Sequence, residues 1–300
     1  GTAGTFTYNL ESVTDGFPTT VSATGSAIIT ITALPIATFS YTTTPYCSNE
    51  TNPFPTFGSG AIAGTFSSTA GLVFVNTSTG QVNLAASTPG TYTVTNTIAA
   101  TGGCGVVTAT SPITITKLPI ATFNYSTTPY CSNEPNPSPT FSFGAIAGTF
   151  SSTAGLVFIN TLTGQVNLTA SIAGTYTVTN TIQAAGGCGV VTATSPITIT
   201  SFPSAIISFT GSSWCRTAGV QNVTLVGTSG GTFSAPAGLS IDASTGSITP
   251  ATSTSGTYVV AYTIAASGGC GITTATTSVT ILATPSAPTV GAITQTTCST

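Results

Sequence analysis

The sequence predicts an all-β protein made of tandem β-sandwich repeats, and three observations support this fold class. A segment of about 84 residues occurs twice with 70 of 83 aligned positions identical, and a third copy is more divergent. Within each copy, apolar residues alternate with threonine and serine at a period of two, which is typical of strands with one buried face. Glycine-rich turns separate these segments, and no stretch shows helical spacing at useful length.

The repeat boundaries follow from aligning the chain with itself. Two nearly identical repeats span residues 34–117 and 118–201, and a divergent repeat spans residues 202–283. Residues 1–33 resemble the last third of a repeat, and residues 284–300 resemble the first strand of a fourth one. We therefore expect either a window on a longer array or a subunit whose partial ends are completed by neighbouring molecules, as in strand exchange.

The strands and turns of one repeat can be placed from the first full copy. Residues 92–98 and 113–115 alternate apolar and polar side chains, and Asn96 is a polar residue on the apolar phase. Turns are expected at "STG", Ser78–Gly80, and at "TGG", Thr101–Gly103. Because about seven short strands fit into 84 residues, the repeat matches an immunoglobulin-like sandwich.

Seven cysteines follow the same period, with two in each full repeat. One lies at the end of the first strand, and the other lies in a glycine-flanked turn 55 to 57 residues later. The simplest arrangement is one disulfide within each repeat, worth about 4 kcal/mol in the loop-entropy model. The expected pairs are Cys47 with Cys104, Cys131 with Cys188, and Cys215 with Cys270, which leaves Cys298 unpaired in this chain. Disulfides persist in oxidising compartments, so the protein is expected to be secreted or exposed on a cell surface.

Reactive or metal-bound cysteines are the alternatives to disulfides. A zinc site usually has four cysteine or histidine ligands, often in close pairs, and the chain has no histidine and no close cysteine pair. A catalytic thiol needs a basic partner, and Lys117 and Arg216 do not recur with the repeat. We therefore expect no metal, no cofactor and no enzymatic activity.

The motif "TPYCSNE" occurs at Thr44–Glu50 and again at Thr128–Glu134. In the structural interpretation, the cysteine anchors a disulfide, the tyrosine packs at the end of the repeat, and the last three residues form a turn. The functional alternative is a ligand contact at Tyr46 and Glu50, and at the matching residues of the second copy. The third repeat has "SSWCRTA" here, without an acid, which favours the structural interpretation.

Charged residues make up 2% of the chain, against roughly 25% in a typical soluble domain. Two basic residues cannot neutralise a phosphate backbone, so nucleic-acid binding is not expected. No run of about 18 apolar residues occurs, so membrane insertion is not expected either. Because surfaces with little charge tend to associate, the expected partners are copies of the chain or further repeats, bound end-to-end or laterally.

The segment Ala237–Ile264 resembles the immunoglobulin-like and PKD-like modules of large bacterial surface adhesins and extracellular fibres. The shared features are "GL" before an alternating strand, "STG" as a turn and "GTY" opening the next strand. Ala70–Ile98 has all three, and its copy Ala154–Ile182 fits the same pattern with "LTG" at the turn. The resemblance implies a structural component of an extracellular filament or of an adhesin stalk. The alternative it leaves open is an adhesin module that binds a surface glycan through loops such as Ser48–Gly60.

Overall fold

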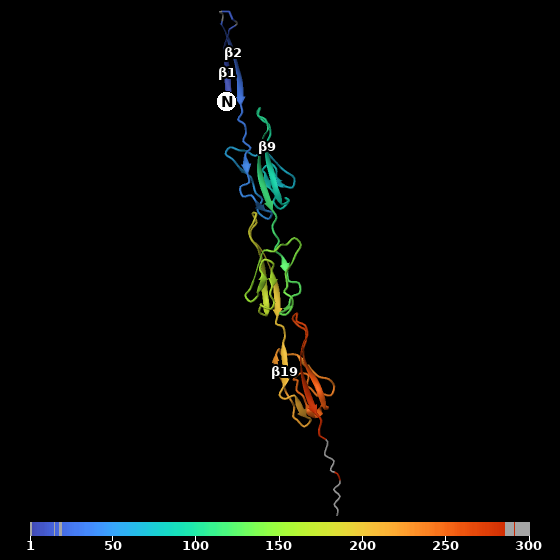
Figure 1. Cartoon of the computed structure of the whole chain (residues 1–300). Coiled ribbons are helices and arrows are strands. Elements are labelled where there is room, and N and C mark those ends of the chain that lie inside the picture. Colours follow the sequence, from blue (N-terminus) through green and yellow to red (C-terminus); the bar gives the residue numbers. More distant parts are fainter. Residues whose placement is uncertain (1, 15, 18–19, 286–290, 292–300) are drawn as a thin grey trace, which may run out of the picture. The chain divides into compact units, whose positions relative to one another are not determined.

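The regular structure of the described residues is β-strand, apart from one short 3-10 turn, η1, at Pro250–Thr252. The computed structural model describes residues 2–14, 16–17, 20–285 and 291 (Figure 1). Three β-sandwich repeats of the immunoglobulin-like type follow one another along the sequence. The expected all-β fold class with tandem sandwich repeats is therefore confirmed.

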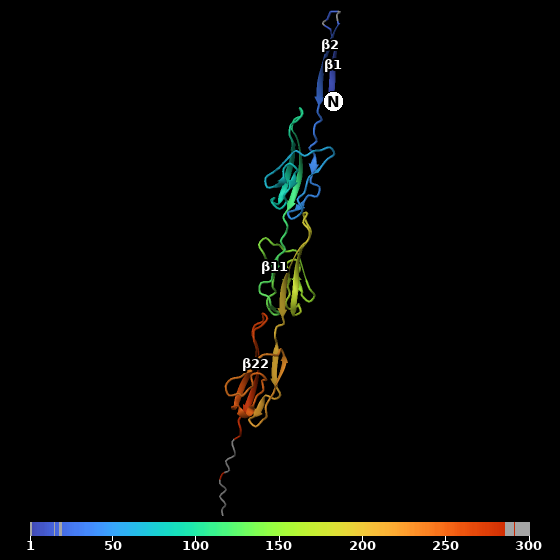
Figure 2. The same cartoon turned by 180° about the vertical axis from the view of Figure 1, so that it is seen from behind.

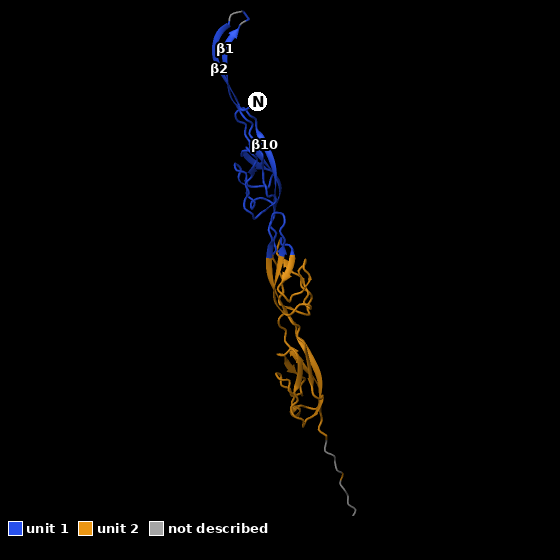
Figure 3. Ribbon diagram, turned by 90° about the vertical axis from the view of Figure 1, so that its left-hand side faces the viewer, with its two compact units in different colours: residues 1–121, 144–148, 181–192 blue, residues 122–143, 149–180, 193–300 orange. Residues whose placement is uncertain are grey.

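The described chain divides into two compact units, which are coloured separately in Figure 3. The first unit comprises residues 1–121, 144–148 and 181–192, and the second comprises residues 122–143, 149–180 and 193–300. The border passes through the second repeat, so the turn that carries Cys188 belongs to the first unit. The five segment boundaries expected from the sequence repeat remain a prediction.

A two-stranded hairpin precedes the first repeat and is formed by β1 (Gly4–Thr14) and β2 (Thr20–Ile31). The strands are antiparallel, with Gly4 opposite Ile31. Among the described residues, each of these strands pairs only with the other.

The first full repeat has eight strands in one four-stranded sheet and two short two-stranded sheets. These are β3 (Phe39–Ser40), β4 (Tyr46–Cys47), β5 (Thr56–Phe57), β6 (Thr65–Ser68), β7 (Phe74–Asn76), β8 (Gln81–Val82), β9 (Gly90–Ile98) and β10 (Val107–Thr116). The large sheet has the order β4-β10-β9-β6, and the small sheets are β3-β5 and β7-β8. In the large sheet β9 and β10 are antiparallel, whereas β4 runs parallel to β10.

The second repeat keeps this plan, and the third keeps the four-stranded sheet and one small sheet, β19-β21, among the described residues. Figure 2 shows β11 and β22 within these repeats. The second repeat contains β11 (Phe123–Asn124), β12 (Tyr130–Cys131), β13 (Thr140–Phe141), β14 (Thr149–Ser152), β15 (Phe158–Asn160), β16 (Gln165–Val166), β17 (Gly174–Ile182) and β18 (Val191–Thr200). The third contains β19 (Ala205–Phe209), β20 (Ser213–Cys215), β21 (Val223–Gly227), β22 (Thr232–Ser234), β23 (Gly256–Ile264) and β24 (Thr273–Leu282). Their four-stranded sheets have the equivalent orders β12-β18-β17-β14 and β20-β24-β23-β22.

The core of the first repeat is built from the apolar phase of the strands. Phe39 packs edge-on against Phe66 with ring centroids 5.2 Å apart, and both side chains are buried. The buried Tyr41 hydroxyl donates a hydrogen bond of 2.6 Å to the carbonyl oxygen of Gly80, and burial raises the pKa of this phenol. Gly80 closes the expected "STG" turn with a φ of 73°, a conformation that favours glycine.

A buried asparagine holds two loops of the first repeat onto its core. Asn96 is fully buried, and its Oδ1 accepts a hydrogen bond of 2.7 Å from the N–H of Gly64. Its Nδ2 donates to the carbonyl oxygens of Ala37 and Ile62, both at 3.0 Å. In the third repeat Tyr262 stands at the aligned position, and its hydroxyl accepts from one loop N–H and donates to one loop carbonyl. The polar residue on the apolar phase therefore satisfies buried backbone groups.

Replacing Asn96 by alanine is expected to lower the free energy of unfolding of the first repeat by about 3 kcal/mol, because three backbone groups lose their partners. Urea unfolding followed by circular dichroism measures this loss. The exposed Asn49→Ala variant is the matched control and should change stability by less than about 0.5 kcal/mol. Equal effects of the two substitutions would contradict the proposed bonding role of Asn96.

Candidate functional site

The disulfides join consecutive repeats, and the expected pairing within repeats is wrong. Cys47 of the first repeat is bonded to Cys188 of the second, and Cys131 of the second is bonded to Cys270 of the third. The Cα atoms of the two pairs are 4.6 and 4.7 Å apart, and all four side chains are buried. Each bond therefore closes a ring that contains a repeat boundary.

The two cysteines of the first repeat cannot reach each other because they lie beside opposite ends of β10. Cys47 is opposite Thr116, the last residue of β10, whereas Cys104 lies in the turn before Val107, where β10 begins. Ten residues of extended strand span roughly 30 Å. A disulfide needs Cα atoms closer than about 7 Å. The end of β10 instead lies beside the cysteine turn of the next repeat.

The first cysteine of each junction is held by a short parallel strand. Tyr46 and Cys47 of β4 lie opposite Ile115 and Thr116 of β10. The N–H of Ser48 donates to the carbonyl oxygen of Thr116 at 2.9 Å. These bonds fix the direction in which the Cys47 sulfur leaves the sheet.

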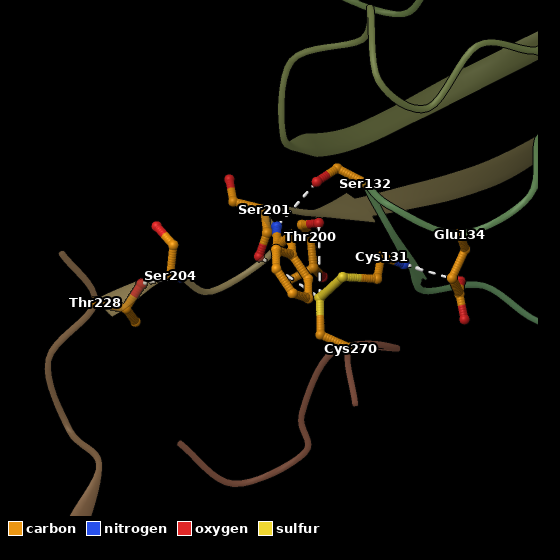
Figure 4. Close-up of a disulfide and its surroundings, with 9 residues drawn as sticks. Cys131, Ser132, Glu134, Thr200, Ser201, Ser204, Thr228 and Cys270 are labelled. Carbon is orange, nitrogen blue, oxygen red and sulfur yellow. Dashed lines mark hydrogen bonds between the residues drawn. A yellow bond between two sulfur atoms is a disulfide. The ribbon is translucent and has the colours of Figure 1, made fainter. Parts of the chain in front are cut away.

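The serine after this cysteine ties the strand to the joint between repeats. The Ser48 hydroxyl accepts a hydrogen bond of 3.2 Å from the N–H of Leu118. In the second junction Ser132 accepts in the same way from the N–H of Phe202 at 2.9 Å (Figure 4). These serines were expected only to form a turn. Their contact with the joint was not predicted, although their occurrence in both "YCS" motifs was an available signal.

The second cysteine of each junction lies in a tight turn whose second glycine lies against the strand of the partner cysteine. Cys188 donates its N–H to the carbonyl oxygen of Ala185 at 2.9 Å. A Cβ added to Gly187 would be 2.2 Å from the backbone oxygen of Pro45, and one added to Gly269 would be 2.3 Å from that of Pro129. Glycine is thus required at both junctions by the close approach of two backbones. The "GGC" sequence had suggested a turn but not this contact.

The other residues of "TPYCSNE" support the same strand. Tyr46, which was expected to pack at the end of the repeat, is buried in its core. The carboxylate of Glu50 accepts a hydrogen bond of 3.1 Å from the N–H of Cys47, and Glu50 donates its own N–H to the carbonyl oxygen of Cys47 at 3.0 Å. The expected turn after the cysteine is therefore present, and Glu134 makes the same carboxylate contact with Cys131 (Figure 4). Both acids contribute to folding the junction.

Three cysteines remain outside these bonds. Cys104 is a free, partly exposed thiol, and Cys215 is a free, exposed thiol. Cys298, which was expected to be unpaired, lies outside the described residues. No group of three or more potential metal ligands of the cysteine, histidine or acidic type is found among the described residues. No helix in the described part of the chain is long and apolar enough to span a membrane.

Comparisons with known proteins return adhesion-type repeats at low similarity. No protein-family model matches the chain, and no curated protein matches its sequence. The EC21-23 fragment of human CDH23 has a TM-score of 0.41 and 14% identity, covering 83% of this chain and 98% of that one. The N-terminal eight immunoglobulin domains of DSCAM have a TM-score of 0.43 and 10% identity, covering 87% of this chain and 38% of that one. Drosophila N-cadherin EC1-4 has a TM-score of 0.29 and 11% identity, covering 94% of this chain and 85% of that one.

Proposed function

We propose that the chain is a load-bearing structural component of an extracellular filament or of an adhesin stalk on a bacterial surface. The observation that carries the proposal is the pair of disulfides that join successive repeats. A bond across each junction limits how far neighbouring sandwiches can separate after one of them unfolds. The sequence resemblance to modules of bacterial surface proteins supports the same role.

The same bonds support an oxidising location. Disulfides that stabilise a fold persist outside the cell and are rare in the reducing cytosol. The four cysteines of these disulfides are buried, which limits the access of small-molecule reductants to the bonds. We therefore place the protein outside the cytosol, where its weakly charged surface favours association with further copies.

The two disulfide rings overlap, and this overlap limits how far the chain can extend under tension. One ring closes residues 47–188 and the other closes residues 131–270. Three chain segments then connect the first disulfide to the second: residues 47–131, 131–188 and 188–270. The shortest is the segment from Cys131 to Cys188, which spans 57 residues. That segment becomes taut first and carries the load when the repeats unfold.

Stretching single molecules from their ends tests this proposal. With both bonds intact, full extension between Cys47 and Cys270 is expected to reach about 200 Å, because 57 residues of extended chain span that length. After reduction the 223 residues between these positions should extend to about 780 Å. A variant with Cys104, Cys215 and Cys298 replaced by serine keeps other disulfides out of the measurement. Equal extension before and after reduction would refute the load-limiting role.

A further inference from the structure

The chain has two basic side chains, Lys117 and Arg216, and both are exposed. Proteolytic cleavage concentrates at exposed positions outside the strands. A protease of the trypsin type, which cuts after lysine or arginine, therefore has two possible cleavage positions. Without disulfides, the two cuts would divide the chain into three separate fragments, and the array would lose its continuity.

A cut after Lys117 falls inside the first disulfide ring and between two complete sandwiches. Cys47 and Cys188, which close this ring, lie on opposite sides of the cut. The strand β10 ends at Thr116 and β11 begins at Phe123, so the cut interrupts no strand. The N-terminal fragment therefore keeps its whole sandwich and stays bonded to the rest of the chain.

A cut after Arg216 falls inside the second ring, which Cys131 and Cys270 close. It separates β19 and β20 from the other strands of the third sandwich, but β19 pairs with β21 and β20 pairs with β24. Trp214 of β20 lies opposite Ile281 of β24 and is buried in the core. The C-terminal fragment is therefore held by a disulfide and by strand pairing.

The segment that is expected to carry the load contains neither cleavage position. It runs from Cys131 to Cys188 and has no lysine or arginine. Lys117 and Arg216 lie in the two longer segments, which are still slack when the shortest one is taut. Hydrolysis of a slack segment leaves the path from one disulfide to the other unbroken.

We propose that the overlapping rings make the array tolerant of proteases that cut after basic residues, because both cuts fall in slack segments. The cut chain keeps its covalent continuity and its extension limit. In each cut, water adds across one amide bond and leaves a carboxylate on the basic residue and an amino group on the next residue, while the disulfides are unchanged. The inference rests on the proposed load-bearing function and adds a protection against cleavage to it.

Two matched variants, Leu162→Lys and Ser78→Lys, add a third cleavage position on or off the load-carrying segment. Both residues are exposed and occupy the same turn of the two nearly identical repeats. In each turn the N–H of this residue donates to the side chain of an asparagine two positions earlier, at 2.8 and 2.7 Å. Position 162 lies between Cys131 and Cys188, whereas position 78 lies in a slack segment.

Complete digestion by trypsin in urea without reductant, followed by mass spectrometry, compares these variants with the parent chain. All three carry serine in place of Cys104, Cys215 and Cys298, which prevents disulfide exchange. The parent and Ser78→Lys should each keep both chain ends in one covalent species, and Ser78→Lys should also release residues 79–117. Leu162→Lys should give two species, one with residues 1–117 and 163–216 and the other with residues 118–162 and 217–300.

Separate fragments from the parent chain, or a single species from Leu162→Lys, would overturn the proposal. Stretching the digested molecules from their ends measures the mechanical part. The cut parent should stop at the same extension of about 200 Å between positions 47 and 270 as the uncut chain, whereas cut Leu162→Lys should come apart. A limit in the uncut chain that is lost in the cut parent would refute this inference alone. The absence of a limit in the uncut chain would instead refute the load-bearing function.

Discussion

Replacing Cys131 by serine should lower the free energy of unfolding of the third repeat by about 5 kcal/mol, because the Cys131–Cys270 bond closes a ring of about 140 residues. In the loop-entropy model, opening such a ring restores that much conformational freedom to the unfolded chain. Trp214, the single tryptophan, is buried in the core of the third repeat and lies within the ring. Its fluorescence therefore reports the relevant unfolding transition in urea under non-reducing conditions.

Two further variants identify the cause of the loss. Cys270→Ser and the double variant Cys131→Ser/Cys270→Ser should lose as much as Cys131→Ser alone, because all three remove one shared bond and their effects are not additive. Cys104→Ser removes a free thiol from the other unit and should change the transition by less than about 0.5 kcal/mol. If Cys131→Ser and Cys104→Ser had the same free energy of unfolding, the disulfide between repeats would not contribute to stability.

The sandwich class, the strand segments and the turns were predictable because they depend on local patterns. Alternation at 92–98 and 113–115 gave the strands β9 and β10, since a period of two fixes which side chains face the core. The turn at Gly80 followed from its sequence in the same way. Even the exception, Asn96, was visible as a polar residue on the apolar phase, although its partners were not.

Disulfide partners were not predictable because they depend on the direction of one two-residue strand. A cysteine at the end of the first strand and another before the last strand are close together only if these strands are antiparallel. Since β4 is parallel to β10, Cys47 lies at the far end of β10 from Cys104. A spacing of 57 residues is compatible with either direction, so counting two cysteines per repeat suggested the wrong partners.

The glycines of the junction had a clear sequence signal whose meaning required the structure. "GGC" occurs in all three full repeats, and a turn explains why these glycines adopt positive φ. Only the approach of the Pro45 backbone to Gly187 shows that the second glycine also gives the partner strand its space. The turn conformation and the contact with the partner can therefore be separated by comparing Gly187 with Gly103.

Replacing Gly187 by alanine should prevent the Cys47–Cys188 bond in most molecules, whereas Gly103→Ala should leave both disulfides intact. Each alanine is placed at nearly the same positive φ, so each incurs the same conformational cost of about 1–2 kcal/mol. Only the alanine at 187 also meets a backbone oxygen, at 2.2 Å, and a backbone cannot move aside as a flexible side chain can. The Cα atoms of Cys47 and Cys188 lie 4.6 Å apart in the bond. A disulfide needs them closer than about 7 Å, and we expect the displaced turn to hold them farther apart.

Thiol labelling followed by peptide mass spectrometry measures this difference directly. In Gly187→Ala, peptides that contain Cys47 and Cys188 should carry the label, while Cys131 and Cys270 remain protected in their own junction. Gly269→Ala should give the reverse pattern, because its Cβ would meet the oxygen of Pro129 at 2.3 Å. If Cys47 were labelled as readily in Gly103→Ala as in Gly187→Ala, strain in the turn, and not the contact with the Pro45 backbone, would decide whether the disulfide forms. The reciprocal pattern would instead show that each junction closes independently, which an array carrying load through successive bonds requires.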